Sequence, residues 1–285
     1  MSVTVRLMTK SQTDIDFAMK MKNHVKWNQV PADWNRFIDL DPEGCFIAEL
    51  DGVPVGTGTT TTYGDKVAWI GMIIVDENYR RHGLGRSIML ACIDYCKRKH
   101  IEVPKLDATP LGNKLYLTLG FVEEFLMDRR EGRGGSFECA KSVRKFETND
   151  LADVVKFDAV NFGVPRPHII ERFAGEYPEI GFVSRDRAGR IDGFLLGRKG
   201  LNAWQIGPWV ADNARSAEDL FKAALNFLGD QPVFFDIVAV NKAILPLVCK
   251  YGFKHQRPFV RMYLGQNRYP GLLENIYAIS GVEKG

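Results

Sequence analysis

Residues 80–87 read RRHGLGRS, a pair of glycines set among three arginines and a histidine. The apolar run WIGMIIV (69–75) precedes this stretch, and IMLACIDYC (88–96), with apolar residues at helical spacing, follows it. The pattern predicts a basic glycine loop between a strand and a helix. Glycine lets the backbone approach a ligand closely, and free N–H groups at a helix N-terminus attract anions. The loop therefore predicts a phosphate site.

The spacing within the loop excludes two familiar phosphate-binding patterns. A dinucleotide GxGxxG loop starting at Gly83 would need glycine where Ile88 stands. A Walker A loop ending at Gly85 would need glycine in place of Arg80 and lysine in place of Arg86.

Strands and helices alternate on both sides of the loop. Apolar periodicity and turn residues predict helices over residues 11–25, 31–41, 86–99 and 111–120. They predict strands over residues 3–8, 45–50, 54–63, 66–75, 105–109 and 121–127. The glycine-rich EGRGGS (131–136) is interpreted as a loop or linker.

The second half of the chain repeats the pattern of the first. WQIGPWVAD (204–212) parallels WIGMIIVD (69–76), and CKYGF (249–253) parallels LTLGF (117–121). We therefore predict an α/β fold (an α+β mixed sheet) of two tandem units, residues 1–139 and 140–285. The second unit has DNARS (212–216) in place of the glycine loop and Val248 in place of Tyr116. We expect this degenerate copy to bind no ligand of the same kind.

Composition narrows the class of protein. A net charge of +3 is too small to indicate a nucleic-acid partner. No apolar run approaches the ~20 residues that span a bilayer, and MSVTVRLMTKSQ at the N-terminus has no signal-peptide core. We expect a cytoplasmic protein without a membrane partner. The five cysteines are dispersed without a CxxC pair, which favours neither a disulfide framework nor a metal site.

The loop fits a third pattern, Arg/Gln-x-x-Gly-x-Gly/Ala after a strand and opening a helix. In this form it resembles the acetyl-CoA pyrophosphate loop of the GNAT (general-control-type N-acetyltransferase) superfamily. LDATPLGNKLYLTLGF (106–121) resembles the second motif of that family, a strand leading into a helix with a tyrosine before Gly-Phe. The resemblance is strong over residues 3–130 and weaker beyond them, so the whole chain resembles a tandem-domain GNAT protein.

The resemblance implies acetyl-CoA as co-substrate and no metal. In the family, the strand before the loop splays from its neighbour at a bulge, and its backbone holds the thioester and the pantetheine arm. The residues that the resemblance assigns to acetyl-CoA are Ile73, Ile74, Val75, Arg80, Arg81, His82, Gly83, Leu84, Gly85, Arg86, Ser87 and Asn113.

The family reaction is direct attack of a neutral amine on acetyl-CoA. Tyr116, four residues before Gly120, matches the family's acid tyrosine, and a phenol keeps its proton at neutral pH. The general base is not assigned, and His24, Asp65 and Asp107 are its candidates.

Several segments are candidates for acceptor binding. Trp27, Asn28 and Gln29, in HVKWNQVPADW (24–34), supply aromatic and amide groups suited to a small polar ligand, or they form a packed loop. GVPRPH (163–168) and HQRPFVRM (255–262) mix basic and aromatic residues. They either shape the substrate site of the first unit or stabilise an interface within the chain or a homodimer.

The predicted function is N-acetyl transfer from acetyl-CoA to a small-molecule or amino-acid-like amine. Two alternatives stay open: an acyltransferase that uses a longer acyl-CoA, and a non-catalytic acyl-CoA-binding sensor.

Overall fold

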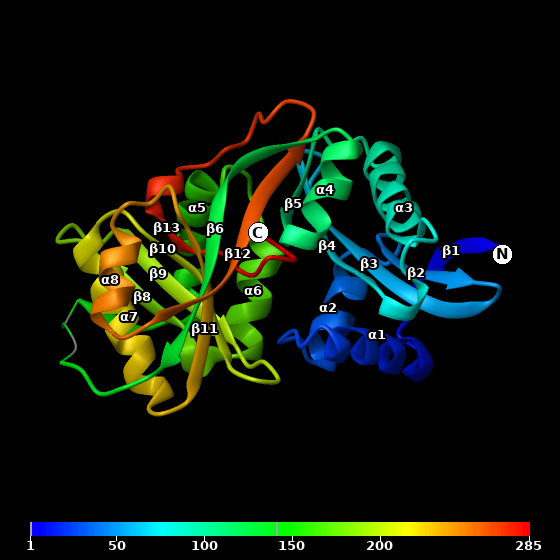
Figure 1. Ribbon diagram of the computed structural model, residues 1–285. Helices are drawn as coiled ribbons and strands as arrows, with labels where there is room; N and C mark the ends of the chain where they lie inside the picture. The colour runs from blue at the N-terminus through cyan, green and yellow to red at the C-terminus, as the bar shows by residue number, and fades with distance from the viewer. Residues whose placement is uncertain (1, 139, 141) are drawn as a thin grey trace.

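A 13-stranded mixed sheet runs through the computed structural model, which describes residues 2–138, 140 and 142–285. Figure 1 shows the two halves of the chain side by side, each with helices against its strands. The predicted α/β class with a mixed sheet is therefore confirmed. The predicted boundary at 139/140 stays a prediction, since residues 139 and 141 lie outside the described residues. No helix of the described chain has the length and apolar character needed to cross a membrane.

The elements of the first half lie close to the predicted ranges. Its helices are α1 (Gln12–His24), α2 (Pro31–Leu40), η1 (Glu77–Tyr79), α3 (Leu84–Arg98) and α4 (Pro110–Thr118). Its strands are β1 (Val3–Leu7), β2 (Cys45–Leu50), β3 (Val53–Tyr63), β4 (Val67–Val75), β5 (Val103–Ala108) and β6 (Phe121–Arg133).

The second half repeats this succession and adds a short strand at its end. Its helices are η2 (Thr148–Asp150), α5 (Leu151–Phe162), α6 (Pro167–Glu176), η3 (Pro178–Ile180), α7 (Ala214–Leu228), α8 (Ile244–Lys250) and η4 (Leu273–Asn275). Its strands are β7 (Val143–Lys145), β8 (Phe182–Arg185), β9 (Ile191–Arg198), β10 (Trp204–Ala211), β11 (Pro232–Val238), β12 (Lys254–Leu264) and β13 (Ile276–Ala278).

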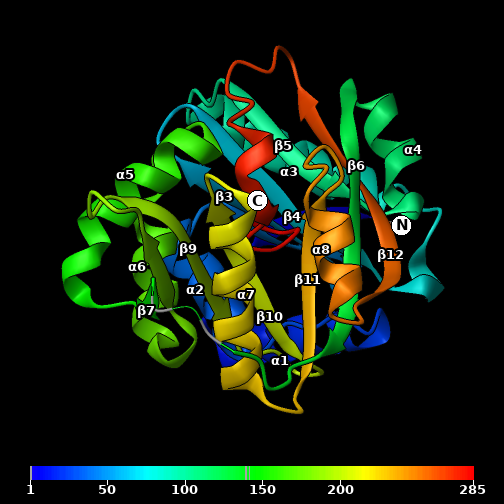
Figure 2. The ribbon, with the colours of Figure 1, turned by 90° about the vertical axis from the view of Figure 1, so that its left-hand side faces the viewer.

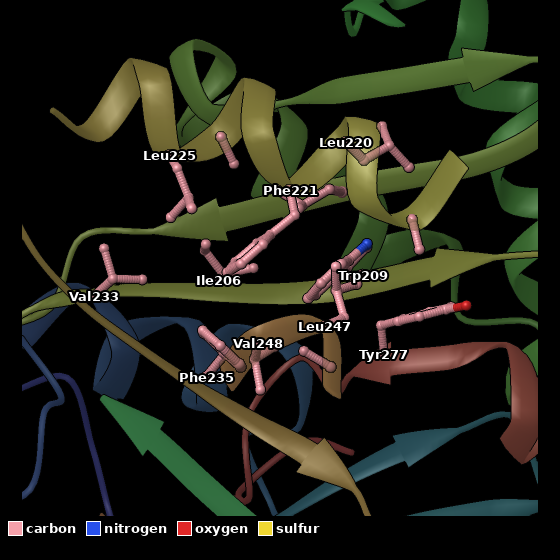
Figure 3. Close-up of a cluster of buried hydrophobic side chains, with 14 of the residues drawn as sticks. Ile206, Trp209, Leu220, Phe221, Leu225, Val233, Phe235, Leu247, Val248 and Tyr277 are labelled. Atoms are coloured by element: carbon pink, nitrogen blue, oxygen red, sulfur yellow. The ribbon is translucent and has the colours of Figure 1, made fainter. Parts of the chain in front are cut away.

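Alternating side chains give each half two apolar layers. On β2, Phe46 and Ala48 pack with Ile88 and Cys92 of α3, whereas Ile47 packs with α1 and α2 on the opposite face. In the second half α7 covers one face of the strands (Figure 2). Trp209 of β10 stacks there on Phe221 of α7 with ring centroids 4.7 Å apart, at the centre of the cluster in Figure 3.

The two halves exchange strands. β12, from the second half, lies between β5 and β6 of the first, and β6 pairs in turn with β11. The β6–β11 ladder runs from Met127 opposite Val238 to Arg133 opposite Pro232. Figure 1 shows β6 and β12 running together across the middle of the molecule. The sheet of each half is therefore completed by a strand of the other.

Two predicted ranges need correction. EGRGGS (131–136) is not wholly a loop, because β6 continues to Arg133 in register with β11. Gly132 suits this strand because a Cβ there would lie 2.6 Å from the ring of Phe253. Helix α3 starts at Leu84 rather than at residue 86, so Gly85 belongs to its first turn.

Buried charges join the halves. Asp33 of α2, fully buried, accepts hydrogen bonds from Arg36 at 2.6 Å and from Arg198 of β9 at 2.9 Å. Arg198 also lies 3.4 Å from Glu283, which pairs with Lys284. Figure 1 shows this C-terminal segment between the halves.

Candidate active site

A bulge in β4 opens the sheet beside the glycine loop. β4 pairs in parallel with β5 only as far as Ile70 opposite Leu106. Met72 then has a φ of 52°, and the register between β3 and β4 shifts. The hydroxyl of Thr57 on β3 donates to the Met72 carbonyl at 2.9 Å and fixes this bulge. The rest of β4 is therefore separated from β5 by a cleft.

The glycine loop leaves the N-terminus of α3 uncapped. Gly83, the N-cap residue, has a φ of 77° and no side chain to accept the first N–H groups. The first N–H that bonds into the helix is that of Ser87, which donates to the Gly83 carbonyl at 3.0 Å. The preceding N–H groups and the helix dipole are therefore available to an anion.

Three arginines surround this N-terminus without neutralising partners. Arg80, Arg81 and Arg86 line one cavity, and in the described part of the chain no carboxylate lies within ion-pair distance of them. The Arg80 side chain makes a long hydrogen bond, 3.4 Å from its Nε to the Val75 carbonyl. Unpaired guanidiniums at an open helix N-terminus fit the pyrophosphate of acetyl-CoA.

We call the cavity that these three arginines line, of about 480 Å³, the loop cavity. Most residues that the sequence assigned to acetyl-CoA line it: Ile73, Ile74, Val75, Arg80, Arg81, Gly83, Leu84, Gly85 and Arg86. The other three lie outside the lining. His82 Nδ1 is 3.1 Å from the Tyr79 carbonyl, Ser87 donates to Gly83, and Asn113 donates to Glu123 at 2.6 Å.

Tyr116 projects from α4 into the cleft. Thr109 caps this helix by accepting the Gly112 N–H at 3.3 Å. The Tyr116 ring packs on Gly112, where a Cβ would lie 2.9 Å from the phenol oxygen. The ring is 8% exposed, and burial raises the pKa of Tyr116. The phenol therefore stays protonated well beyond neutral pH.

A second, smaller cavity lies deeper in the cleft. This inner cavity, of about 40 Å³, is lined by Tyr116, Gly71, Met72, Asp107 and Glu283 among others. Its floor includes the C-terminal segment, since a Cβ on Gly71 would lie 2.8 Å from the Glu283 Cα. Sequence reasoning missed this contribution because GVEKG (281–285) carries no local motif.

The three candidate bases are widely separated. His24 is exposed at the end of α1, and Asp65 is exposed in the turn before β4, at the end away from the bulge. Of the three, only Asp107 lines the inner cavity. Its carboxylate is held by Arg261 at 2.8 and 3.0 Å, and burial raises its pKa while Arg261 opposes that shift.

The three residues predicted to bind the acceptor substrate have different surroundings. Trp27 lines both the loop cavity and the inner cavity. Asn28 is buried and holds the second half in place: its side chain accepts from Asn202 at 2.8 Å and donates to the Ala203 carbonyl at 2.9 Å. Gln29 is buried, and its Oε1 has no hydrogen-bond partner among the described residues.

The equivalent cleft of the second half is filled by the chain itself. β10 pairs with β11 only at Trp204 and Gln205, and β13 then pairs with β10 opposite Trp209 and Val210. Gly207 allows this approach, because a Cβ there would lie 1.9 Å from the Ile279 carbonyl. The N-terminus of α7 is closed as well, since the Asn213 side chain accepts the Ser216 N–H at 2.9 Å.

Comparison with known families matches both halves. The acetyltransferase (GNAT) family model matches residues 16–121, and a second model, an acetyltransferase (GNAT) domain, matches residues 154–278.

Known proteins resemble the chain over most of its length. A holothin acyltransferase from Pseudoalteromonas sp. is 26% identical over 91% of this chain and 87% of its own. An uncharacterized N-acetyltransferase of Bacillus subtilis, YitH, is 24% identical over 75% of each. The crystal structure of a putative acetyltransferase from Pyrococcus horikoshii superposes with a TM-score of 0.84 at 25% identity, over 99% of this chain and 96% of that one. A tandem GNAT protein from the clavulanic acid biosynthesis pathway shares the fold, with a TM-score of 0.64 at 12% identity over 93% of this chain and 100% of that one.

Proposed function

The chain belongs to the GNAT superfamily as a tandem-domain acyltransferase, and from this premise we propose that its first half transfers an acetyl group from acetyl-CoA to a small-molecule amine. One contrast carries the proposal. The first cleft is open and lined by Tyr116 and by arginines that pair with no carboxylate of the described residues, whereas β13 fills the second. An uncompensated cationic cleft next to a buried phenol suits an anionic acyl donor with a thiolate leaving group.

Each part of the cleft has a distinct task in this account. When bound, acetyl-CoA supplies an activated acetyl group and a sulfur that leaves with the bonding electrons. The open α3 N-terminus, with Arg81 and Arg86, holds the pyrophosphate. The backbone of residues 73–75 lies along the cavity and holds the pantetheine arm. Tyr116 holds a proton where the departing sulfur can receive it.

The size of the inner cavity supports acetyl as the transferred group. Its volume is small, about 40 Å³, and the Glu283 backbone blocks extension past Gly71. A longer acyl donor is the second candidate, since the name of the Pseudoalteromonas relative, holothin acyltransferase, does not specify an acetyl group. The direct test is release of free CoA thiol from acetyl-CoA and from octanoyl-CoA, mixed with a panel of primary amines. The proposal expects turnover with acetyl-CoA, and turnover with octanoyl-CoA alone would overturn it.

Removing the two loop arginines should weaken donor binding. In the variant Arg81→Gln/Arg86→Gln, we expect Kd for acetyl-CoA to rise about tenfold, because each exposed charge-assisted contact contributes about 0.5–1 kcal/mol. Calorimetry at two ionic strengths measures the effect, which should shrink in high salt. Arg98→Gln, at the other end of α3, is the matched control and should leave Kd unchanged. If the unsubstituted protein and both variants bound acetyl-CoA with the same Kd, the two loop arginines would not be part of the donor site.

A further inference from the structure

A third cavity lies on the other side of Trp27, between the two halves. This inter-half cavity, of about 480 Å³, is bounded by Asn23 and residues 25–28 of the first half and by Leu201, Asn202, Gln256 and Arg257 of the second. It shares Val25 and Trp27 with the loop cavity, and Trp27 also lines the inner cavity. The inter-half cavity therefore adjoins the other two cavities at Trp27.

The lining of the inter-half cavity is cationic. It includes Lys26, Arg129 and Arg257, and none of the described residues that line it is acidic. Arg129 is already neutralised, because Asp236 accepts its Nε and Nη2 at 2.7 and 2.8 Å. The remaining positive charge belongs to Lys26 and Arg257.

Arg257 lacks the partner that a partly buried guanidinium needs. Its Nε is buried without a hydrogen-bond partner among the described residues, and no described carboxylate pairs with it. Its guanidinium lies 5.3 Å from the centroid of the Phe259 ring, which limits its movement. Burial, and then the neighbouring Arg129, lower the pKa of Arg257 to about 10. Keeping the guanidinium charged at this position therefore costs free energy.

We infer that Arg257 binds a carboxylate on the acceptor, so that the acceptor is an amino-acid-like anion rather than a simple amine. The planar guanidinium matches a carboxylate through two parallel N–H donors, and a bound anion would neutralise a charge that no described carboxylate pairs with. The amine of such a molecule then points past Trp27 toward Tyr116. This inference rests on the proposed function, since it names the class of molecule that the first half acetylates.

The test uses protein saturated with CoA, so that the loop arginines are occupied. N-acetylglycine and its neutral analogue N-acetylglycinamide are titrated in by calorimetry. Neither probe carries a side chain that could clash in the acceptor site. We expect N-acetylglycine to bind at least about tenfold more tightly, as charge-assisted hydrogen bonds imply. Arg257→Gln should abolish this preference, and Arg257→Lys should restore part of it. Arg187→Gln, an exposed arginine of the β8–β9 turn, is the control that should keep it.

The possible results distinguish a failure of the carboxylate site from a failure of the proposed acetyl transfer. Equal binding of both probes, no binding of the carboxylate, or an unchanged preference in Arg257→Gln would overturn the carboxylate site and leave acetyl transfer standing. Failure of CoA itself to bind in the first titration would overturn the proposed function, and the carboxylate site with it.

Discussion

Replacing Tyr116 with phenylalanine is expected to lower kcat for acetyl transfer about a hundredfold, the lower range for loss of a general acid. The Kd for acetyl-CoA should stay within about twofold of the unsubstituted value, because the ring still packs on Gly112 and only the hydroxyl is lost. Steady-state thiol release and calorimetry measure the two quantities separately.

The pH profile gives the same prediction a second readout. Burial raises the pKa of Tyr116, and an acid acts in its protonated form, so the phenol should cause no loss of kcat as pH rises to about 9.5. Tyr263→Phe, on β12 of the same sheet, is the matched control and should keep full activity. If Tyr116→Phe had the same kcat as the unsubstituted protein, Tyr116 would not be the general acid.

Replacing Asp33 with alanine is expected to lower the free energy of unfolding by about 3–5 kcal/mol, as for other broken buried ion pairs. Asp33 is 0% exposed and accepts hydrogen bonds from Arg36, Arg198 and the Val30 N–H. Its loss would leave Arg198 buried with the more distant Glu283, at 3.4 Å, as its one carboxylate partner among the described residues. Urea unfolding followed by circular dichroism measures the change.

An exposed aspartate provides the comparison for this prediction. Asp94 pairs with Lys97 at 3.3 Å on the surface of α3, with 58% of the Asp94 side chain exposed. Asp94→Asn should change the unfolding free energy by less than about 0.5 kcal/mol. If Asp33→Ala were equally mild, the charge network would not hold the two halves together.

Sequence reasoning located the first cleft because its determinants are local. The bulged strand, the glycine loop and the start of α3 are consecutive, so the order RRHGLGRS after WIGMIIV already specifies their arrangement. The repeat also predicted the second unit, and its missing glycines correctly distinguished the two helix starts. Asn213 caps the N-terminus of α7, whereas Gly83 leaves the N-terminus of α3 open.

Contacts between distant segments could not be predicted in this way. The ranges of β6 and β12 show ordinary strand patterns, and nothing in them indicates that each completes the sheet of the other half. The same holds for β13 and Glu283, whose partners Gly207 and Gly71 lie far along the chain. The sequence left open whether HQRPFVRM (255–262) faces the substrate cleft or an interface. Arg257 of this segment lines the inter-half cavity, which is bounded by both halves.

In the proposed function one half of this chain binds the acyl donor, whereas the other half fills its own cleft with β13. Calorimetric titration of acetyl-CoA into the unmodified protein tests it most directly, through the number of sites. The account predicts saturable binding with one acetyl-CoA per chain, because β13 occupies the cleft beside β10. Binding of two molecules per chain would contradict the closed second cleft, and no binding would contradict the open first one.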